Sequence, residues 1–167
     1  MRMSETKKFV YVTMLSAIAI SLNIFESIFI GNIFPFGIRI GLANIIALVT
    51  IVKFGVKDML VVNIMRVFIG NLLRGLIFGS TFWIALGGVI LSSFALIIGQ
   101  KLKASLIFIS VISSIMHSFG QVLVVIFFYK QPGMIAIMPY LLLGAIPMGI
   151  VTGIVAKEAL RLMNKKI

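Results

Sequence analysis

Six strongly apolar segments, joined by short connections, run through almost the whole chain. Of its 167 residues, 61% are hydrophobic and only 11% are charged, whereas a soluble domain is about half apolar and about a quarter charged. A bilayer crossing needs about 20 apolar residues in a helix. The sequence therefore predicts an all-α integral membrane protein, a six-transmembrane-helix bundle that forms a single membrane domain over residues 1–167, with spans at about 9–30, 38–52, 59–73, 75–99, 104–129 and 134–156.

The second and third segments are close to the lower length limit for a crossing, and both carry polar groups. Short elements at membrane depth are tolerated where protein buries them. Either these two segments cross fully, or they form a re-entrant hairpin or pack inside the bundle. The first segment, which begins at Phe9, is too long for a cleavable signal peptide, so we expect an uncleaved first span.

Basic residues are distributed unevenly over the two sides of this zigzag. Eleven of the 15 Lys and Arg residues fall on one side: Arg2, Lys7, Lys8, Lys53, Lys57, Lys101, Lys103, Lys157, Arg161, Lys165 and Lys166. Short loops rich in Lys and Arg stay in the cytoplasm, so we expect both termini there. The net charge of +11 then sets orientation and contacts anionic lipid rather than nucleic acid.

Several kinds of chemistry lack the residues that they require. Cysteine is absent, and the chain has one His and four acidic residues, which gives no metal-ligand cluster and no thiol nucleophile. Neither an Asp-rich motif for a magnesium diphosphate nor a Walker loop for ATP occurs. We therefore expect no enzyme activity, no catalytic residues, no metal and no cofactor.

Two patches of small residues indicate close helix contacts. Thr13, Ala17 and Ser21 are spaced four apart in the first span, and Gly149 and Gly153 form the same step in the last. Membrane helices associate through such small residues. Each patch either packs inside the bundle or, for the first span, docks a second membrane subunit, and the sequence leaves both alternatives open.

Polar side chains at membrane depth mark a candidate ligand site. A charge at the centre of a membrane helix costs about 2.5–3.5 kcal/mol on insertion scales, so such residues face protein or a wet cavity. Arg66 lies near the middle of the third span, and Asn63, Arg66 and Arg74 share one helix face. The candidate ligand-binding residues are Arg39, Asn44, Asn63, Arg66, Arg74, Ser92, His117 and Gln121.

This set carries an excess of positive charge, which suits an anionic ligand because Arg binds phosphate or carboxylate with two parallel hydrogen bonds. Apolar walls would suit a ligand with an apolar body. Structural roles compete with this interpretation. Glu26 can pair with Arg39 or Arg74, Arg74 can reach the interface, and His117 with Gln121 can hydrogen-bond between helices.

Four pieces of sequence resemble a known family: Arg39-Ile-Gly-Leu-Ala-Asn44, the lone Arg66, Gly87-Gly88 with Ser92, and His117-Ser-Phe-Gly-Gln121. Together they resemble the heptaprenyl diphosphate synthase component I family, also called the Gx transporter family, over about Lys8 to Lys157. That family is similar to the substrate-binding S components of energy-coupling factor (ECF) vitamin transporters.

The resemblance implies a six-helix bundle of the S-component type in a bacterial plasma membrane, with a ligand site near the external face. It also implies a transmembrane coupling subunit and two ATPases as partners. S components contact the coupling subunit through an Ala-xxx-Ala pattern on their first helix, which corresponds here to Ala17 and Ser21.

Three functions follow from these observations. The first is a substrate-binding subunit of an importer for an isoprenoid-like, quinone-precursor or vitamin-like ligand. The second is a non-catalytic accessory subunit that holds a soluble prenyl synthase at the membrane through the basic tail from Lys157. A stand-alone channel is the least favoured, since no filter motif is present.

Overall fold

The computed structural model describes residues 4–30 and 41–165, and these residues form six α-helices and no strand. The α-helices are α1 (Glu5–Phe25), α2 (Leu42–Lys53), α3 (Val56–Leu73), α4 (Ser80–Lys101), α5 (Leu106–Phe127) and α6 (Met138–Lys165). A π-helical turn, η1 (Glu26–Ile30), continues α1, and a short 3-10 helix, η3 (Pro132–Ala136), precedes α6. The predicted all-α class is confirmed.

Four segments are long and apolar enough to cross a bilayer: Glu5–Phe29, Ser80–Lys101, Leu106–Phe127 and Met138–Met163. Large apolar side chains on their outer surfaces are exposed, among them Phe9, Phe94 and Leu143. Apolar surface of this extent is rare on soluble monomers and marks contact with a membrane or partner. The chain is therefore a multi-pass helical membrane protein.

Helix α2 lies at the centre of the bundle. Its 12 residues span only about 18 Å, less than the roughly 30 Å of a bilayer core. Six of them are buried, Ala43 and Ala47–Ile51, and the helix contacts α1, α3 and α6. The segment predicted as the second span is thus an apolar helix that the others surround.

Two helix ends differ from the predicted spans. The fourth span was expected from residue 75, but α4 begins at Ser80, because Gly75 and Phe78 have positive φ angles of 67° and 59° in a turn. The sixth span was expected to end at Ala156, but α6 continues to Lys165. Its last turns are rich in Ala, Leu, Lys and Arg, which favour helix strongly.

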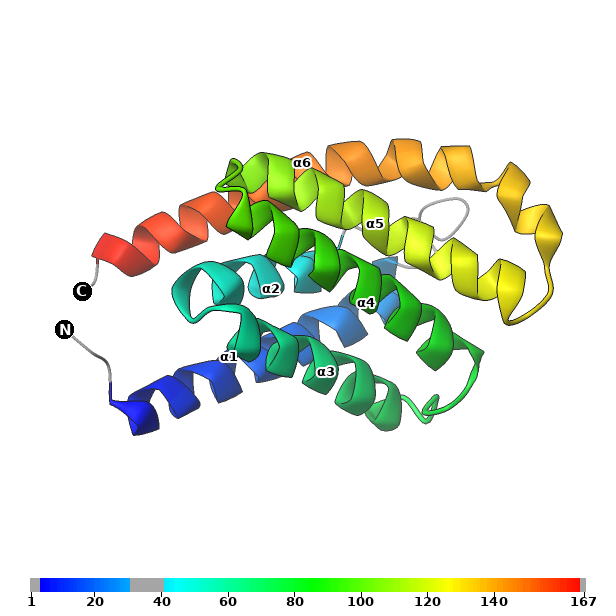
Figure 1. Ribbon diagram of the computed structural model, residues 1–167. Coiled ribbons are helices and arrows are strands. Elements are labelled where there is room, and N and C mark those ends of the chain that lie inside the picture. The colour runs from blue at the N-terminus through cyan, green and yellow to red at the C-terminus, as the bar shows by residue number, and fades with distance from the viewer. Residues whose placement is uncertain (1–3, 31–40, 166–167) are drawn as a thin grey trace.

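The beginning of α1 and the end of α6 lie at the same end of the bundle, together with the connections α2–α3 and α4–α5 (Figure 1). We call this the basic end, because it carries Lys7, Lys8, Lys53, Lys57, Lys101, Lys103, Lys157 and Arg161. At this end the ammonium of Lys8 on α1 lies 2.8 Å from the carboxylate of Asp58 on α3. Lys130, in the connection α5–α6, belongs to the opposite end.

Glycines bring α4, α5 and α6 into backbone contact. A Cβ on Gly120 of α5 would lie 2.5 Å from the carbonyl oxygen of Gly87 on α4. On α6, Cβ atoms on Gly149 and Gly153 would lie 2.6 and 2.9 Å from Cα atoms of α5. The Gly149 and Gly153 step therefore packs inside the bundle.

The small-residue patch on α1 is different. Thr13, Ala17 and Ser21 are all exposed, and the Thr13 hydroxyl donates only to the carbonyl of Phe9 in its own helix, at 2.9 Å. The buried residues of this helix are its neighbours Val12, Ser16 and Ala19. Internal packing therefore does not account for this patch, and docking of a partner stays a prediction.

The contact between α4 and α5 gives a direct test. We expect Gly120→Ala to force the two backbones apart and to destabilise the protein by about 1–3 kcal/mol, the usual cost of overpacking. Gly133→Ala is the matched control, because no atom lies within 4 Å of its Cβ position and its φ is not positive. Thermal unfolding in detergent should give a lower midpoint for Gly120→Ala alone, and equal midpoints would contradict the packing described.

Candidate functional site

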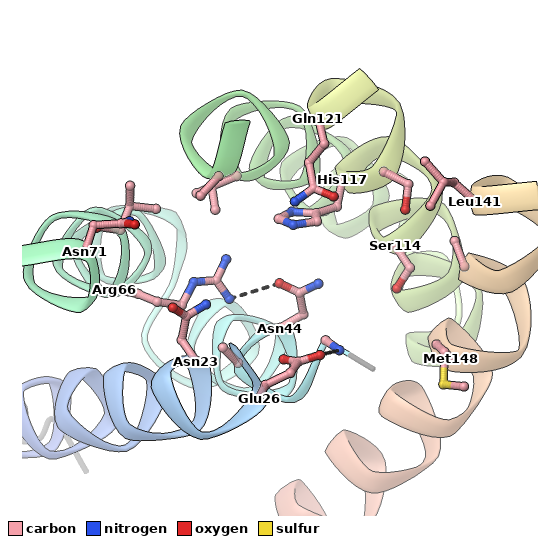
Figure 2. A pocket seen from close by; sticks show the side chains of 17 residues that line it. Asn23, Glu26, Asn44, Arg66, Asn71, Ser114, His117, Gln121, Leu141 and Met148 are labelled. Carbon is pink, nitrogen blue, oxygen red and sulfur yellow. Dashed lines mark hydrogen bonds between the residues drawn. The ribbon is translucent and has the colours of Figure 1, made fainter. Parts of the chain in front are cut away.

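A polar pocket lies in the half of the bundle away from the basic end. It is formed by the end of α1 with η1, the beginning of α2, the middle and end of α3, the first half of α4, the middle of α5 and the first half of α6. Figure 2 shows its polar side chains pointing toward a shared space between these helices. The cavity volume is about 50 Å³, far below the roughly 300–1,000 Å³ of a typical ligand pocket.

Arg66 provides a buried positive charge on one wall of the pocket. It comes from the middle of α3, is only 3% exposed, and donates from Nη1 to Oδ1 of Asn44 on α2 at 3.0 Å. Figure 2 shows the guanidinium directed into the pocket. A buried charge in a membrane protein requires polar partners, and Asn44 supplies one from the neighbouring helix.

Glu26 provides a negative charge on the adjacent wall. Its buried carboxylate accepts hydrogen bonds from the backbone N–H groups of Gly41, at 2.5 Å, and of Leu42, at 3.1 Å. These groups begin α2, where the helix dipole favours an anion. Gly41 has a φ of 80°, a conformation that glycine adopts without strain.

A pairing of Glu26 with Arg39 or Arg74 was one alternative that the sequence left open. The described part of the chain shows its carboxylate at the beginning of α2, a capping role that sequence reasoning missed. Arg39 lies outside the described residues, so its pairing and its place in the site stay predictions. A glycine at position 41, directly before an apolar helix without a Ser, Thr, Asp or Asn cap, was the available signal for a cap from elsewhere.

His117 and Gln121 lie one turn apart on α5 and face α4 at a glycine. A Cβ on Gly88 would lie 2.9 Å from both His117 Cε1 and Gln121 Cγ. Any larger residue at position 88 would displace these two side chains. The Gly87-Gly88 pair therefore serves two contacts: Gly87 meets the α5 backbone, and Gly88 leaves space for the side chains of the pocket.

Sequence reasoning missed several polar residues that line the pocket. Asn71 donates to the Val67 carbonyl at 2.7 Å, while its buried Oδ1 has no hydrogen-bond partner in the part of the chain that is described. Asn23, Ser114 and Ser118 line the same space. The helical spacing of Ser114, His117, Ser118 and Gln121 placed them on one face of α5, which was the available signal.

Three predicted site residues do not line the pocket. The Asn63 amide donates to the Ser93 hydroxyl on α4 at 2.8 Å. Ser92 is buried, and its hydroxyl donates to the Val89 carbonyl at 3.1 Å within α4. Arg74 ends α3 and donates to the Ser27 hydroxyl at 3.1 Å. All three side chains hydrogen-bond elsewhere in the bundle, and their part in ligand binding stays a prediction.

The pocket can therefore bind a ligand through one guanidinium, several amides and hydroxyls and an imidazole. Among its described lining residues, Arg66 and Glu26 carry the charges. The predicted positive excess included Arg39, which lies outside the described residues, so it stays a prediction. No group of three His, Asp or Glu side chains that could hold a metal ion occurs within residues 4–30 and 41–165.

Comparison with known proteins places the chain in a family. The family described as heptaprenyl diphosphate synthase component I matches residues 15–160, which include the pocket, the whole of α2 to α5 and the larger part of α6. Searches of curated proteins and of solved structures gave no significant match. With nearly its whole length matched, this chain belongs to the heptaprenyl diphosphate synthase component I family.

Proposed function

We propose that this protein is the substrate-binding subunit of an ECF-type importer in a bacterial plasma membrane, and that it is not an enzyme. Its ligand would be small, anionic and partly apolar. One observation carries the proposal: Arg66, Asn44, His117 and Gln121 come from three helices and meet in one pocket. A bundle that needed these groups only for stability would not require a cavity between them.

The size of the cavity constrains how such a ligand enters. A volume of about 50 Å³ holds a few water molecules, so a larger ligand requires the surrounding helices to separate. Binding sites whose occupied form differs from the free form are common in transport, where an element opens and closes around the ligand. We propose that the conformation described here is the closed one.

The family description supports a second function. A component I of heptaprenyl diphosphate synthase implies a second component, and the protein would then anchor a soluble prenyl synthase. The exposed basic residues at the end of α6, such as Arg161, would be the contact. In this alternative, the polar pocket supplies or receives a polyprenyl compound without catalysing its synthesis.

Membrane orientation can be tested on this chain without removing any native cysteine, since none is present. We propose that the basic end is cytoplasmic and that the six helices form one membrane domain, with the short α2 inside the bundle. Leu102→Cys, between α4 and α5, should then react with an impermeant maleimide only after the cells are opened. Gly133→Cys, between α5 and α6, should react in intact cells. The reverse pattern would invert the proposed topology.

Ligand binding can be tested by native mass spectrometry of the purified protein, which detects a retained small molecule. We expect Arg66→Ala to lower occupancy about tenfold or more, because a hydrogen bond to a charged group contributes roughly 1.5–3 kcal/mol. Arg161→Ala is the matched control, since it removes the same group from the exposed surface of α6. Equal occupancy in both variants would rule out the proposed site.

The two functions differ in the partners that they require. The importer predicts co-purification with a transmembrane coupling subunit and ATPases, and uptake that depends on ATP. It also predicts that Ala17→Leu, on the exposed face of α1, weakens this association. Ala136→Leu is the matched control, because it adds the same atoms to an exposed alanine at the other end of the bundle, and it should leave the association unchanged. Co-purification with a soluble prenyl synthase alone would favour the accessory subunit.

A further inference from the structure

We infer that the ligand of the polar pocket carries a long apolar tail, and that this tail lies in a groove between α3 and α4 that opens to the lipid. This inference rests on the proposed function, because it takes the polar pocket as the binding site for the head of the ligand. It adds the class of ligand, which is an amphipathic anion. It also adds the entry route, which leads from the lipid bilayer through the side of the bundle.

The groove is a second hollow in the described part of the bundle, with a volume of about 260 Å³. Its walls are apolar side chains of α3 and α4, including Leu60, Ile64, Phe94 and Ile97. The two polar residues that line it, Asn63 and Ser93, hydrogen-bond to each other at 2.8 Å. The Oδ1 of Asn63 has no hydrogen-bond partner in the described part of the chain, and the rest of the lining is apolar and suits a chain of methyl and methylene groups.

The groove adjoins the polar pocket at two buried valines. Val67 of α3 and Val89 of α4 belong to one packed cluster and line both spaces, so a ligand that occupies both requires these two side chains to move apart. From these valines the groove extends toward the basic end, as far as Leu60 and Ile97. Along α4, the distance from Val89 to Ile97 is about 12 Å at a rise of 1.5 Å per residue.

Helices α3 and α4 are suited to separate at this seam. They follow each other in the chain, yet their contact is far less extensive than that between α4 and α5. Glycines bring α4 and α5 together, whereas Ile64 and Ile90, at the lips of the groove, are exposed. A movement that widens the seam leaves the glycine contact between α4 and α5 intact.

The small volume of the polar pocket indicates which part of the ligand would lie in the groove. About 50 Å³ is enough for part of a ligand beside Arg66, and the groove provides the adjoining space for the rest. Since the groove faces lipid, a tail reaches it from the bilayer without passing through water. Prenyl phosphates and other single-chain anions combine such a head and tail.

The test uses protein in nanodiscs and a farnesyl diphosphate analogue with a photoreactive group at the tail end. After irradiation, peptide mass spectrometry should place the cross-links on α3 and α4 near Leu60 and Ile97. Excess inorganic pyrophosphate should abolish these cross-links, because it occupies the head site. Arg66→Lys should lose them as well, since an ammonium does not reproduce two parallel hydrogen bonds.

A blocked groove provides the decisive variant. Ile64→Trp with Ile90→Trp fills the lips of the groove and should abolish the cross-links while calorimetric binding of pyrophosphate is unchanged. Leu72→Trp with Ile98→Trp adds the same bulk to exposed positions on the same two helices outside the groove. This control should keep the cross-links.

The outcomes separate this inference from the proposed function. Pyrophosphate binding with cross-links outside the groove, or with none, would overturn the tail assignment and leave the head site in place. Cross-links in the groove that pyrophosphate does not reduce would mean that ordinary lipid chains occupy it, which also overturns the inference. Absence of both pyrophosphate binding and specific cross-links would overturn the anionic head and the tail together.

Discussion

A buried guanidinium in the middle of α3 is the constraint on which the pocket depends. Hydrocarbon provides no hydrogen bonds, so Arg66 requires polar groups of neighbouring helices as its hydrogen-bond partners. Asn44 from α2 lies opposite, and the carboxylate of Glu26 lies on the adjacent wall. The central position of α2, surrounded by other helices although too short to span a bilayer, brings these groups to the same depth.

Two kinds of helix contact divide the bundle into a tight part and a looser one. Between α4, α5 and α6, glycine removes the side chains that would separate the backbones, and the Ser110 and Thr152 hydroxyls add a hydrogen bond of 2.9 Å across α5 and α6. Between α3 and α4, branched apolar side chains leave a groove. Tight packing fixes His117 and Gln121 in place, whereas the looser seam gives the pocket a side that can open.

Much of this architecture could be predicted from the sequence, because hydrophobicity and charge act over whole segments. The helical class, the six apolar helices and the gathering of Lys and Arg at one end all follow from patterns many residues long. The end of α6 was misplaced because a basic amphipathic stretch was taken for a tail, although its residues favour helix. The start of α4 depended on two positive φ angles that hydropathy does not reveal.

The site was only partly predictable, because whether a polar residue lines the pocket depends on the direction in which its side chain points. Arg66, Asn44, His117 and Gln121 were identified from depth and helical spacing, and they line one pocket. Asn63 satisfied the same criteria but donates to Ser93 on α4. The capping role of Glu26 was missed, because a carboxylate that caps a helix fifteen residues later in the chain leaves little local signal.

The position of Glu26 has a consequence for selectivity. An anion that approaches the beginning of α2 meets two N–H groups already occupied by a carboxylate of the same chain. A group tethered in this way acts at an effective concentration in the millimolar range or above, so dilute monovalent anions such as chloride or acetate compete poorly. The beginning of α2 is thus neutralised from within the chain and needs no anion from the surrounding medium.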